Sequence, residues 1–189
     1  MTHYTVFSEV SSFIQKKLRE KLCPEPIVST SMIEVISPNS SNVDYTLGVY
    51  LYDIKEFNEL NQAGMVSVND NTQRMPPTVY ELDYMIFVNT KTQSGIKEID
   101  IHKIFGRVAQ VMADNGVVLL QNEGVYPPPN IVSAKLTLEE KSRIWTALNI
   151  PYNLCLMYKV YPVYLESERI VKASRVREST FILDDKKGK

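Results

Sequence analysis

Residues 80–88 read YELDYMIFV, and this stretch decides the fold. Its side chains alternate between two sets, one apolar throughout and one that begins with two carboxylates: Tyr80, Leu82, Tyr84, Ile86 and Val88, and Glu81, Asp83, Met85 and Phe87. Successive side chains of a strand point to opposite faces of a sheet, so the first set predicts a buried core face. Met85 and Phe87 predict that the second face is partly covered, with Glu81 and Asp83 solvated near its edge.

Other segments predict further strands around this one. The same period of two recurs from Tyr45 to Ile54 and from Leu154 to Tyr164, which predicts two more long strands. Shorter apolar segments at 32–36, 117–120 and 131–136 are interpreted as short strands. Residues 61–77 lack periodicity and end in Pro76-Pro77, so we expect an extended loop there.

Three segments have helical patterns. Residues 4–22 form an amphipathic pattern, and an apolar stripe runs from Ile101 to Met112 before Asn115-Gly116, a left-handed helix stop. Thr137 to Glu140 has capping-box spacing and opens a third helix, on which Trp145 is the expected core anchor.

Together the patterns predict an α/β (α+β) fold, a mixed and mainly antiparallel sheet packed with two or three helices. We expect a single domain over residues 1–165 and a polar C-terminal arm over residues 166–189.

Composition narrows the possible partners. The chain has 189 residues, and its 21 Lys plus Arg against 22 Asp plus Glu give a net charge of -1, too little to attract nucleic acid. No apolar run approaches the ~20 residues of a membrane span, and the N-terminus lacks the pattern of a signal peptide. Cys23 and Cys155, far apart, suit reduced cytosolic thiols. We therefore expect assembly in the cytoplasm, no nucleic-acid or membrane partner, and release only by lysis or within a larger particle.

Residues that carry enzyme chemistry are few and scattered. Seven glycines form no phosphate-binding loop, and the two histidines and two cysteines are too dispersed to predict a metal site. His102, the only internal histidine, is expected on the solvent side of a helix. Glu81 and Asp83 could hold a cation or divide acid and base roles, but a spacing of two on a strand is weakly specific. We expect no catalytic residue, no cofactor and no metal.

Two features favour protein contacts. The many strand tyrosines fit a core role, with a protein interface or an aromatic ligand cleft left open. The tail from 166 to 189 holds seven Lys or Arg and five Asp or Glu, too polar for a core. Within it, Phe181-Ile182-Leu183 could add a strand to an exposed sheet edge, and the basic residues would face an acidic partner surface. The predicted partner-binding residues are Arg169, Lys172, Arg175, Arg177, Phe181, Ile182 and Leu183. A disordered solubilising tail is the alternative.

Four segments occur in an order known from one family. They are LGVYLYDI at 47–54, PPTVYELDYMI at 76–86, HKIFGRV at 102–108 and WTALNIPYNLCLMYKV at 145–160. Together they resemble the N-terminal domain of the tail-terminator, or cap, proteins of extracellular contractile injection systems and related phage-tail-like particles. The likeness spans nearly all of residues 4–165, and each segment is a core pattern.

The resemblance implies a structural assembly protein without enzymatic activity. Such a subunit forms a ring, expected to be a hexamer, on the end of the inner tube opposite the baseplate, and it binds the last sheath ring. Its partners would be copies of itself, tube protein and sheath protein. Relatives continue into a second domain, so a baseplate or sheath adaptor of the same particle stays open. A deep apolar pocket would instead favour a small-ligand-binding α+β domain.

Overall fold

The computed structural model describes residues 4–41, 44–57, 64–69, 72–90, 97–120 and 126–172. These residues form three α-helices, α1 (Val6–Leu22), α2 (Glu98–Asp114) and α3 (Leu138–Ala147), and a short 3₁₀ helix, Thr30–Met32. The strands are β1 (Ile33–Val35), β2 (Leu47–Glu56), β3 (Val66–Asn69), β4 (Thr72–Arg74), β5 (Thr78–Val88), β6 (Asn130–Ser133), β7 (Cys155–Leu165) and β8 (Ile170–Lys172). The predicted α/β class is confirmed.

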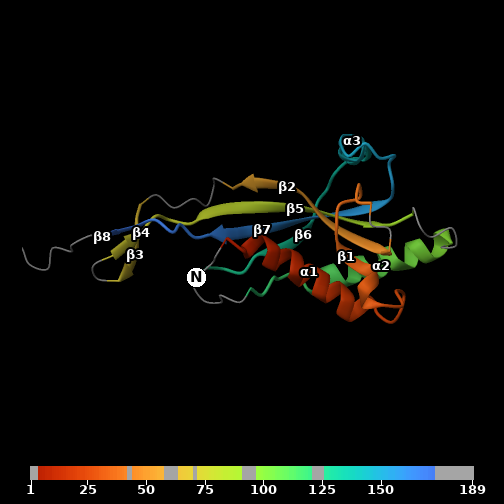
Figure 1. The fold of residues 1–189 in the computed structure, drawn as a ribbon, viewed down its shortest axis with the longest axis horizontal. Helices are drawn as coiled ribbons and strands as arrows, with labels where there is room; N and C mark the ends of the chain where they lie inside the picture. The colour runs from red at the N-terminus through yellow and green to blue at the C-terminus, as the bar shows by residue number, and fades with distance from the viewer. Residues whose placement is uncertain are drawn as a thin grey trace, which may run out of the picture.

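The main sheet has the order β1-β2-β5-β7-β6. Only β1 and β2 pair in parallel, and the other neighbours are antiparallel, so the predicted mixed and mainly antiparallel sheet is confirmed. Helices α1 and α2 lie on one face of this sheet, while α3 lies on the other (Figure 1). The molecule therefore has three layers, with a core on each side of β5.

The larger core lies between the sheet and helices α1 and α2. The predicted apolar face of β5 is buried here, with Leu82, Tyr84 and Ile86 all 0% exposed. The Tyr84 hydroxyl forms a 2.8 Å hydrogen bond with the Ser11 hydroxyl of α1, which satisfies this fully buried polar group.

The smaller core lies under α3. Thr137 caps this helix as predicted, since its hydroxyl accepts from the Glu140 amide at 3.3 Å and the Glu140 carboxylate accepts from the Thr137 amide at 2.7 Å. Trp145 is 2% exposed, which confirms it as a core residue, and it packs with Phe87 and Met85 of β5. Gly48 of β2 lies opposite Phe87, and a Cβ there would come within 2.3 Å of the ring, so only glycine allows this close approach.

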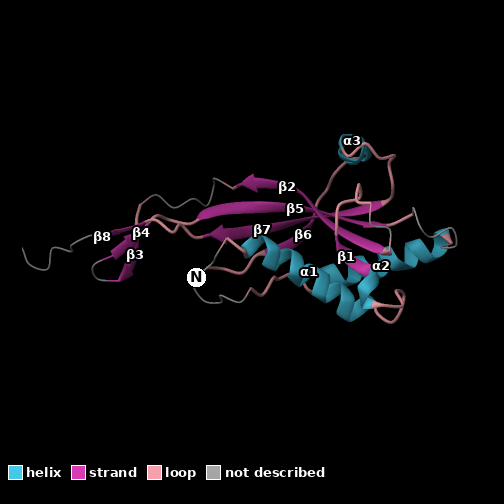
Figure 2. Ribbon diagram, in the orientation of Figure 1, coloured by secondary structure: helices cyan, strands magenta, loops and turns pink. Residues whose placement is uncertain are grey.

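A second, three-stranded sheet has the order β3-β4-β8. It lies past the ends of β5 and β7 and away from all three helices (Figure 2). The expectation of a loop over residues 61–77 is therefore wrong at 66–69 and 72–74, which pair as β3 and β4. These strands are too short to show a period in the sequence, and the third strand of the sheet, β8, lies almost a hundred residues away.

Two smaller expectations are also wrong. Residues 117–120 form only an isolated bridge between Val117 and Asn130 rather than a strand. Helix α2 ends without a left-handed residue, since Asn115 has φ -116° and Gly116 has no positive φ. Instead, the backbone amide and the side-chain amide of Asn115 both donate to the Val111 carbonyl, at 3.0 and 2.8 Å, and this double contact closes the last turn.

No helix within the described ranges is both long and apolar enough to span a bilayer.

Candidate interaction surface

The half of the sheet face that α3 leaves uncovered carries a cluster of charged side chains, which we call the charge cluster: Asp53, Lys55, Glu81, Asp83 and Lys159. A bulge in β2 creates its arrangement, because the register with β5 shifts between Leu51 and Asp53. After the shift, Asp53 lies opposite Asp83 and Lys55 lies opposite Glu81. A bulge thus turns successive charged residues of β2 toward the carboxylates of β5.

Lys55 joins two carboxylates of different strands. Its ammonium donates to Asp83 and lies 3.3 Å from the Asp53 carboxylate. The hydrogen bond to Asp83 raises the pKa of Lys55 above its ordinary value, so this side chain stays charged. On the next strand, the Lys159 ammonium donates to Glu81 at 2.6 Å.

The interpretation of Glu81 and Asp83 as solvated carboxylates is wrong. The Asp83 side chain is 1% exposed and that of Glu81 is 12% exposed, and each pairs with a lysine of a neighbouring strand, Lys55 of β2 and Lys159 of β7. Asp83 Oδ1 is buried and has no hydrogen-bond partner among the described residues. Burial of a carboxylate is costly unless it is paired, so Lys55 is essential to this arrangement.

Aromatic side chains surround the cluster. Burial raises the pKa of Tyr52 to about 12, and the nearby Asp83 carboxylate adds to the shift. Phe57 and Tyr161 lie with ring centroids 5.8 Å apart at the end of the same face. Other tyrosines, such as Tyr84 and Tyr158, are buried in the core, so the structural interpretation is correct for those two residues.

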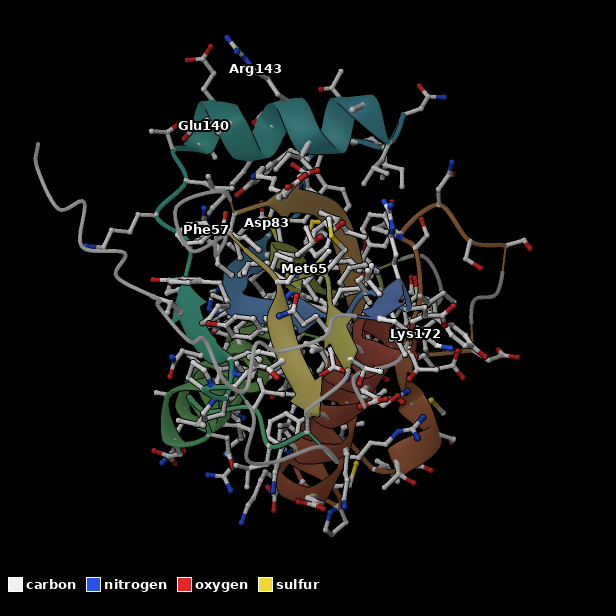
Figure 3. The ribbon with its side chains drawn as sticks, turned by 90° about the vertical axis from the view of Figure 1, so that its left-hand side faces the viewer. Phe57, Met65, Asp83, Glu140, Arg143 and Lys172 are labelled. Carbon is white, nitrogen blue, oxygen red and sulfur yellow. The ribbon has the colours of Figure 1, made fainter. Side chains whose placement is uncertain are left out.

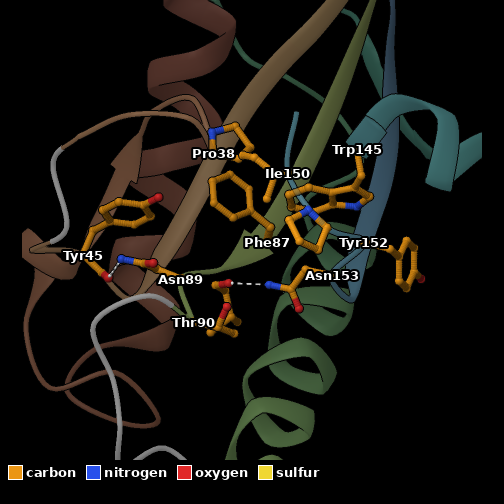
Figure 4. A pocket seen from close by; sticks show the side chains of 11 residues that line it. Pro38, Tyr45, Phe87, Asn89, Thr90, Trp145, Ile150, Tyr152 and Asn153 are labelled. Carbon is orange, nitrogen blue, oxygen red and sulfur yellow. Dashed lines mark hydrogen bonds between the residues drawn. The ribbon is translucent and has the colours of Figure 1, made fainter. Parts of the chain in front are cut away.

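The described residues also line a pocket beside α3, with a volume of about 330 Å³ (Figure 4). Phe87, Trp145 and Ile150 form apolar walls, and the amides at the mouth are engaged with the backbone. Asn89 donates to the Tyr45 carbonyl and Asn153 to the Val88 carbonyl, each at 3.1 Å. Its eleven lining residues include no Asp, Glu, His, Cys, Lys or Arg, so the pocket holds no acid–base pair.

The predicted partner-binding residues fall into two groups. Arg169 directly precedes β8, and Lys172 is its last residue. This strand pairs with β4, and both side chains are exposed. Arg175, Arg177, Phe181, Ile182 and Leu183 lie outside the described residues. The first part of the segment after Leu165 thus contributes a strand to the small sheet.

An ion pair holds the small sheet to the end of β7, because Arg74 of β4 pairs with Glu166, which follows β7. Close to this ion pair, Tyr126 stacks on Tyr164 of β7, with ring centroids 4.6 Å apart and planes inclined by 13°. The ion pair lies at the point where the small sheet leaves the main one.

Enzyme-type groups are dispersed in the described part of the chain. No three His, Cys, Asp or Glu side chains there gather in a way that could hold a metal ion. His102 is exposed on α2, as expected, and its Nε2 lies 3.5 Å from Glu98 of the same helix. Cys23 and Cys155 are free thiols.

Lys55 and Lys159 belong to the charge cluster, yet sequence patterns do not single them out. Each occupies a strand position that alternates with core residues. Their cross-strand partners, Asp83 for Lys55 and Glu81 for Lys159, lie far from them in the sequence. A lysine at a strand position directed toward a covered face is the signal that could have indicated a buried carboxylate partner.

The fold is that of a tube-terminating protein of contractile injection systems. The sheath/tube terminator of the extracellular contractile injection system PVC, in its extended state, matches with a TM-score of 0.69 and 18% identity, over 94% of this chain and 62% of that one. The tube-terminating cap of the anti-feeding prophage matches with a TM-score of 0.66 and 18% identity, over 92% of this chain and 60% of that one. The chain thus spans about three fifths of the length of these structures. No curated protein matches the sequence significantly.

The sequence identifies the family directly. Residues 9–179 match the model of the Pvc16 N-terminal domain, and the chain belongs to this family. The match begins within α1 and includes both sheets and the other two helices.

Proposed function

We propose that the chain is a structural terminator subunit, which forms a closed ring on the end of an inner tube and binds the adjoining sheath. The observation that carries this proposal is the shared fold over 94% of the chain with a sheath/tube terminator. Membership of the Pvc16 N-terminal domain family supports it independently of the structural likeness.

The surfaces of the molecule suit assembly better than catalysis. The charge cluster pairs its lysines with carboxylates, and such pairs position strands rather than leaving a free acid or base. The pocket beside α3 has apolar walls without an ionisable acid–base pair. We therefore infer a non-enzymatic role, carried out on cytoplasmic assembly intermediates that become part of a larger particle.

A ring is the simplest assembly for such a role. A protein that ends a tube must match the tube's rotational symmetry, and a closed ring does so with one repeated head-to-tail contact. A hexamer is the proposed size. The ring then needs two further surfaces, one for the tube and one for the sheath.

Tube growth in the presence of the protein tests this function. Purified tube protein is polymerised with rising amounts of the chain, and tube lengths are measured by electron microscopy. The proposal expects shorter tubes that carry the protein at one end, with Arg143→Glu on the exposed face of α3 as a matched surface control. Binding along the tube wall, or at the baseplate end in whole particles, would indicate an adaptor and contradict the proposal.

A further inference from the structure

We propose that the small sheet of one copy docks on the charge cluster of the next copy, with Arg169 and Lys172 facing Asp53 at the exposed end of the cluster. The inference rests on the proposed ring, and it assigns the two surfaces that would form its repeated contact.

The small sheet lacks a core of its own. Its strands span three or four residues each, and it lies apart from the helices (Figure 1). Three-stranded sheets of this size need an apolar face packed against something to be stable. Met65, Met75 and Ile170 are instead 42%, 37% and 59% exposed. These apolar groups are available for burial against another molecule.

The small sheet is nevertheless held in a defined position. The ion pair between Arg74 of β4 and Glu166 joins it to the end of β7. The Met75 amide also donates to the Arg169 carbonyl at 3.3 Å, which extends the pairing of β4 with β8. A projection fixed in this way loses little conformational entropy on binding.

Its basic side chains are not matched within the same copy. Arg169 and Lys172 are exposed, and within the described ranges neither side chain forms an ion pair. Figure 3, which looks along the molecule from the end with the small sheet, shows Lys172 well to one side of Asp83. The two groups therefore do not meet inside one copy.

The charge cluster has more carboxylates than ammonium groups, and this excess of negative charge complements the basic side chains of the small sheet. Its three carboxylates, Asp53, Asp83 and Glu81, face two ammonium groups, those of Lys55 and Lys159. Asp53 shares its lysine with Asp83 and remains 47% exposed, and the buried Asp83 Oδ1 has no partner in the described chain. An added cation above Asp53 would balance the cluster.

The surroundings of the cluster also suit an interface. Helix α3 covers the Phe87 end of this face, while the Asp53 end is open beside Phe57 and Tyr161. Aromatic side chains around a charged pair exclude water when a partner binds, which strengthens the electrostatic contact. Because the projection and the cluster are different surfaces of one chain, their contact is head-to-tail and can close into a ring.

Charge-reversal variants of the full chain test the contact. Arg169→Glu with Lys172→Glu, and separately Asp53→Lys, should each weaken self-association by at least about tenfold, measured by sedimentation velocity, because they place like charges together. All three changes in one chain should restore association, since the charges are then exchanged. Arg143→Glu, in an exposed pair with Glu139, should associate like the wild type. Melting temperatures of the variants separate lost contact from lost folding.

The possible results separate this contact from the proposed function. Self-association that depends on these charges, without any effect on tube length, would support the contact and contradict the terminator role. Variants that associate normally, or a combined variant as weak as its parents, would overturn the contact even if the wild type still caps tubes. A wild type that stays monomeric both alone and with tube protein would overturn both.

Discussion

Trp145 packs edge-on against Phe87, with ring centroids 5.9 Å apart and ring planes at 90°. Phe87 makes the same type of contact with Tyr45 on its other side, at 6.1 Å and 88°. This row of three rings fills the core between α3 and the sheet. It joins a helix that contributes only one fully buried side chain, Trp145, to the central strand.

Trp145→Ala should destabilise the protein by about 3–5 kcal/mol, because it leaves a large cavity beside Phe87 that the sheet cannot close. Urea unfolding followed by circular dichroism measures the loss. Leu138→Ala, at an exposed position of the same helix, should change stability by less than about 0.5 kcal/mol. An unchanged unfolding midpoint for Trp145→Ala, together with lost partner binding, would instead make Trp145 an interface residue.

Lys55→Met should cost more stability than Asp83→Asn. The first change leaves a buried carboxylate without its cation, whereas the second leaves a lysine that water can solvate, since its side chain is 51% exposed. We expect a loss of about 2–3 kcal/mol for Lys55→Met, below the range of fully buried pairs because of solvent screening. Lys103→Met, which breaks an exposed pair with Asp100, should have no measurable effect in the same unfolding assay. The reverse order of the first two variants would contradict the assignment of Asp83 as the dependent partner.

Stability should fall in alkaline solution as tyrosines ionise in the unfolded state. Burial raises the pKa of Tyr84 to about 12, above the ordinary tyrosine value of 10.0. The folded state therefore keeps its proton while the unfolded chain loses it. The Tyr84 contribution is complete below pH 10.0 and is lost as the pH rises to about 12.

Unfolding in urea at several pH values between 9 and 12 checks the Tyr84 effect. Tyr84→Phe should lower stability at neutral pH by about 1 kcal/mol, through loss of the Ser11 hydrogen bond, but should show a shallower alkaline decline. The slope should differ from that of the wild type by about 1.4 kcal/mol per pH unit, the value for one proton. Tyr4→Phe, at a position 84% exposed, should follow the wild-type curve. Identical slopes for all three proteins would refute a protonated, buried Tyr84.

Truncation after Leu165 should leave the main sheet stable but abolish ring formation. It removes β8 and Glu166, and with them a strand and an ion pair of the small sheet. Truncation after Lys172 is the matched comparison, because it keeps β8, Arg169 and Lys172. If the arm acts as predicted, this longer chain should associate more weakly than the full protein, through loss of Arg175, Arg177 and residues 181–183. Full ring assembly by the chain that ends at Leu165 would place every contact in the remaining domain.

Local patterns predict the long elements correctly where one face is buried throughout. In the strand at 80–88, every second side chain is apolar or aromatic because that face packs in the core beneath α1. Thr137 and Glu140 cap α3 through contacts between residues only three positions apart. Such information is contained in a few neighbouring residues, so it can be read from the sequence.

Features that depend on distant residues could not be predicted in this way. The residue types around Tyr52 do not predict the bulge there. The bulge nevertheless places Asp53 and Lys55 opposite Asp83 and Glu81. Likewise β4 gains a second partner, β8, from the far end of the described chain. For this reason the carboxylates were expected to be solvated and residues 61–77 were expected to be a loop, while the elements around both were predicted correctly.

Electron cryomicroscopy of whole particles, with an affinity label on this chain, tests the terminator role most directly. We expect one closed ring of this fold on the tube end opposite the baseplate, in contact with both tube and sheath. Label at the baseplate, or spread along the sheath with the distal tube end occupied by another protein, would contradict it.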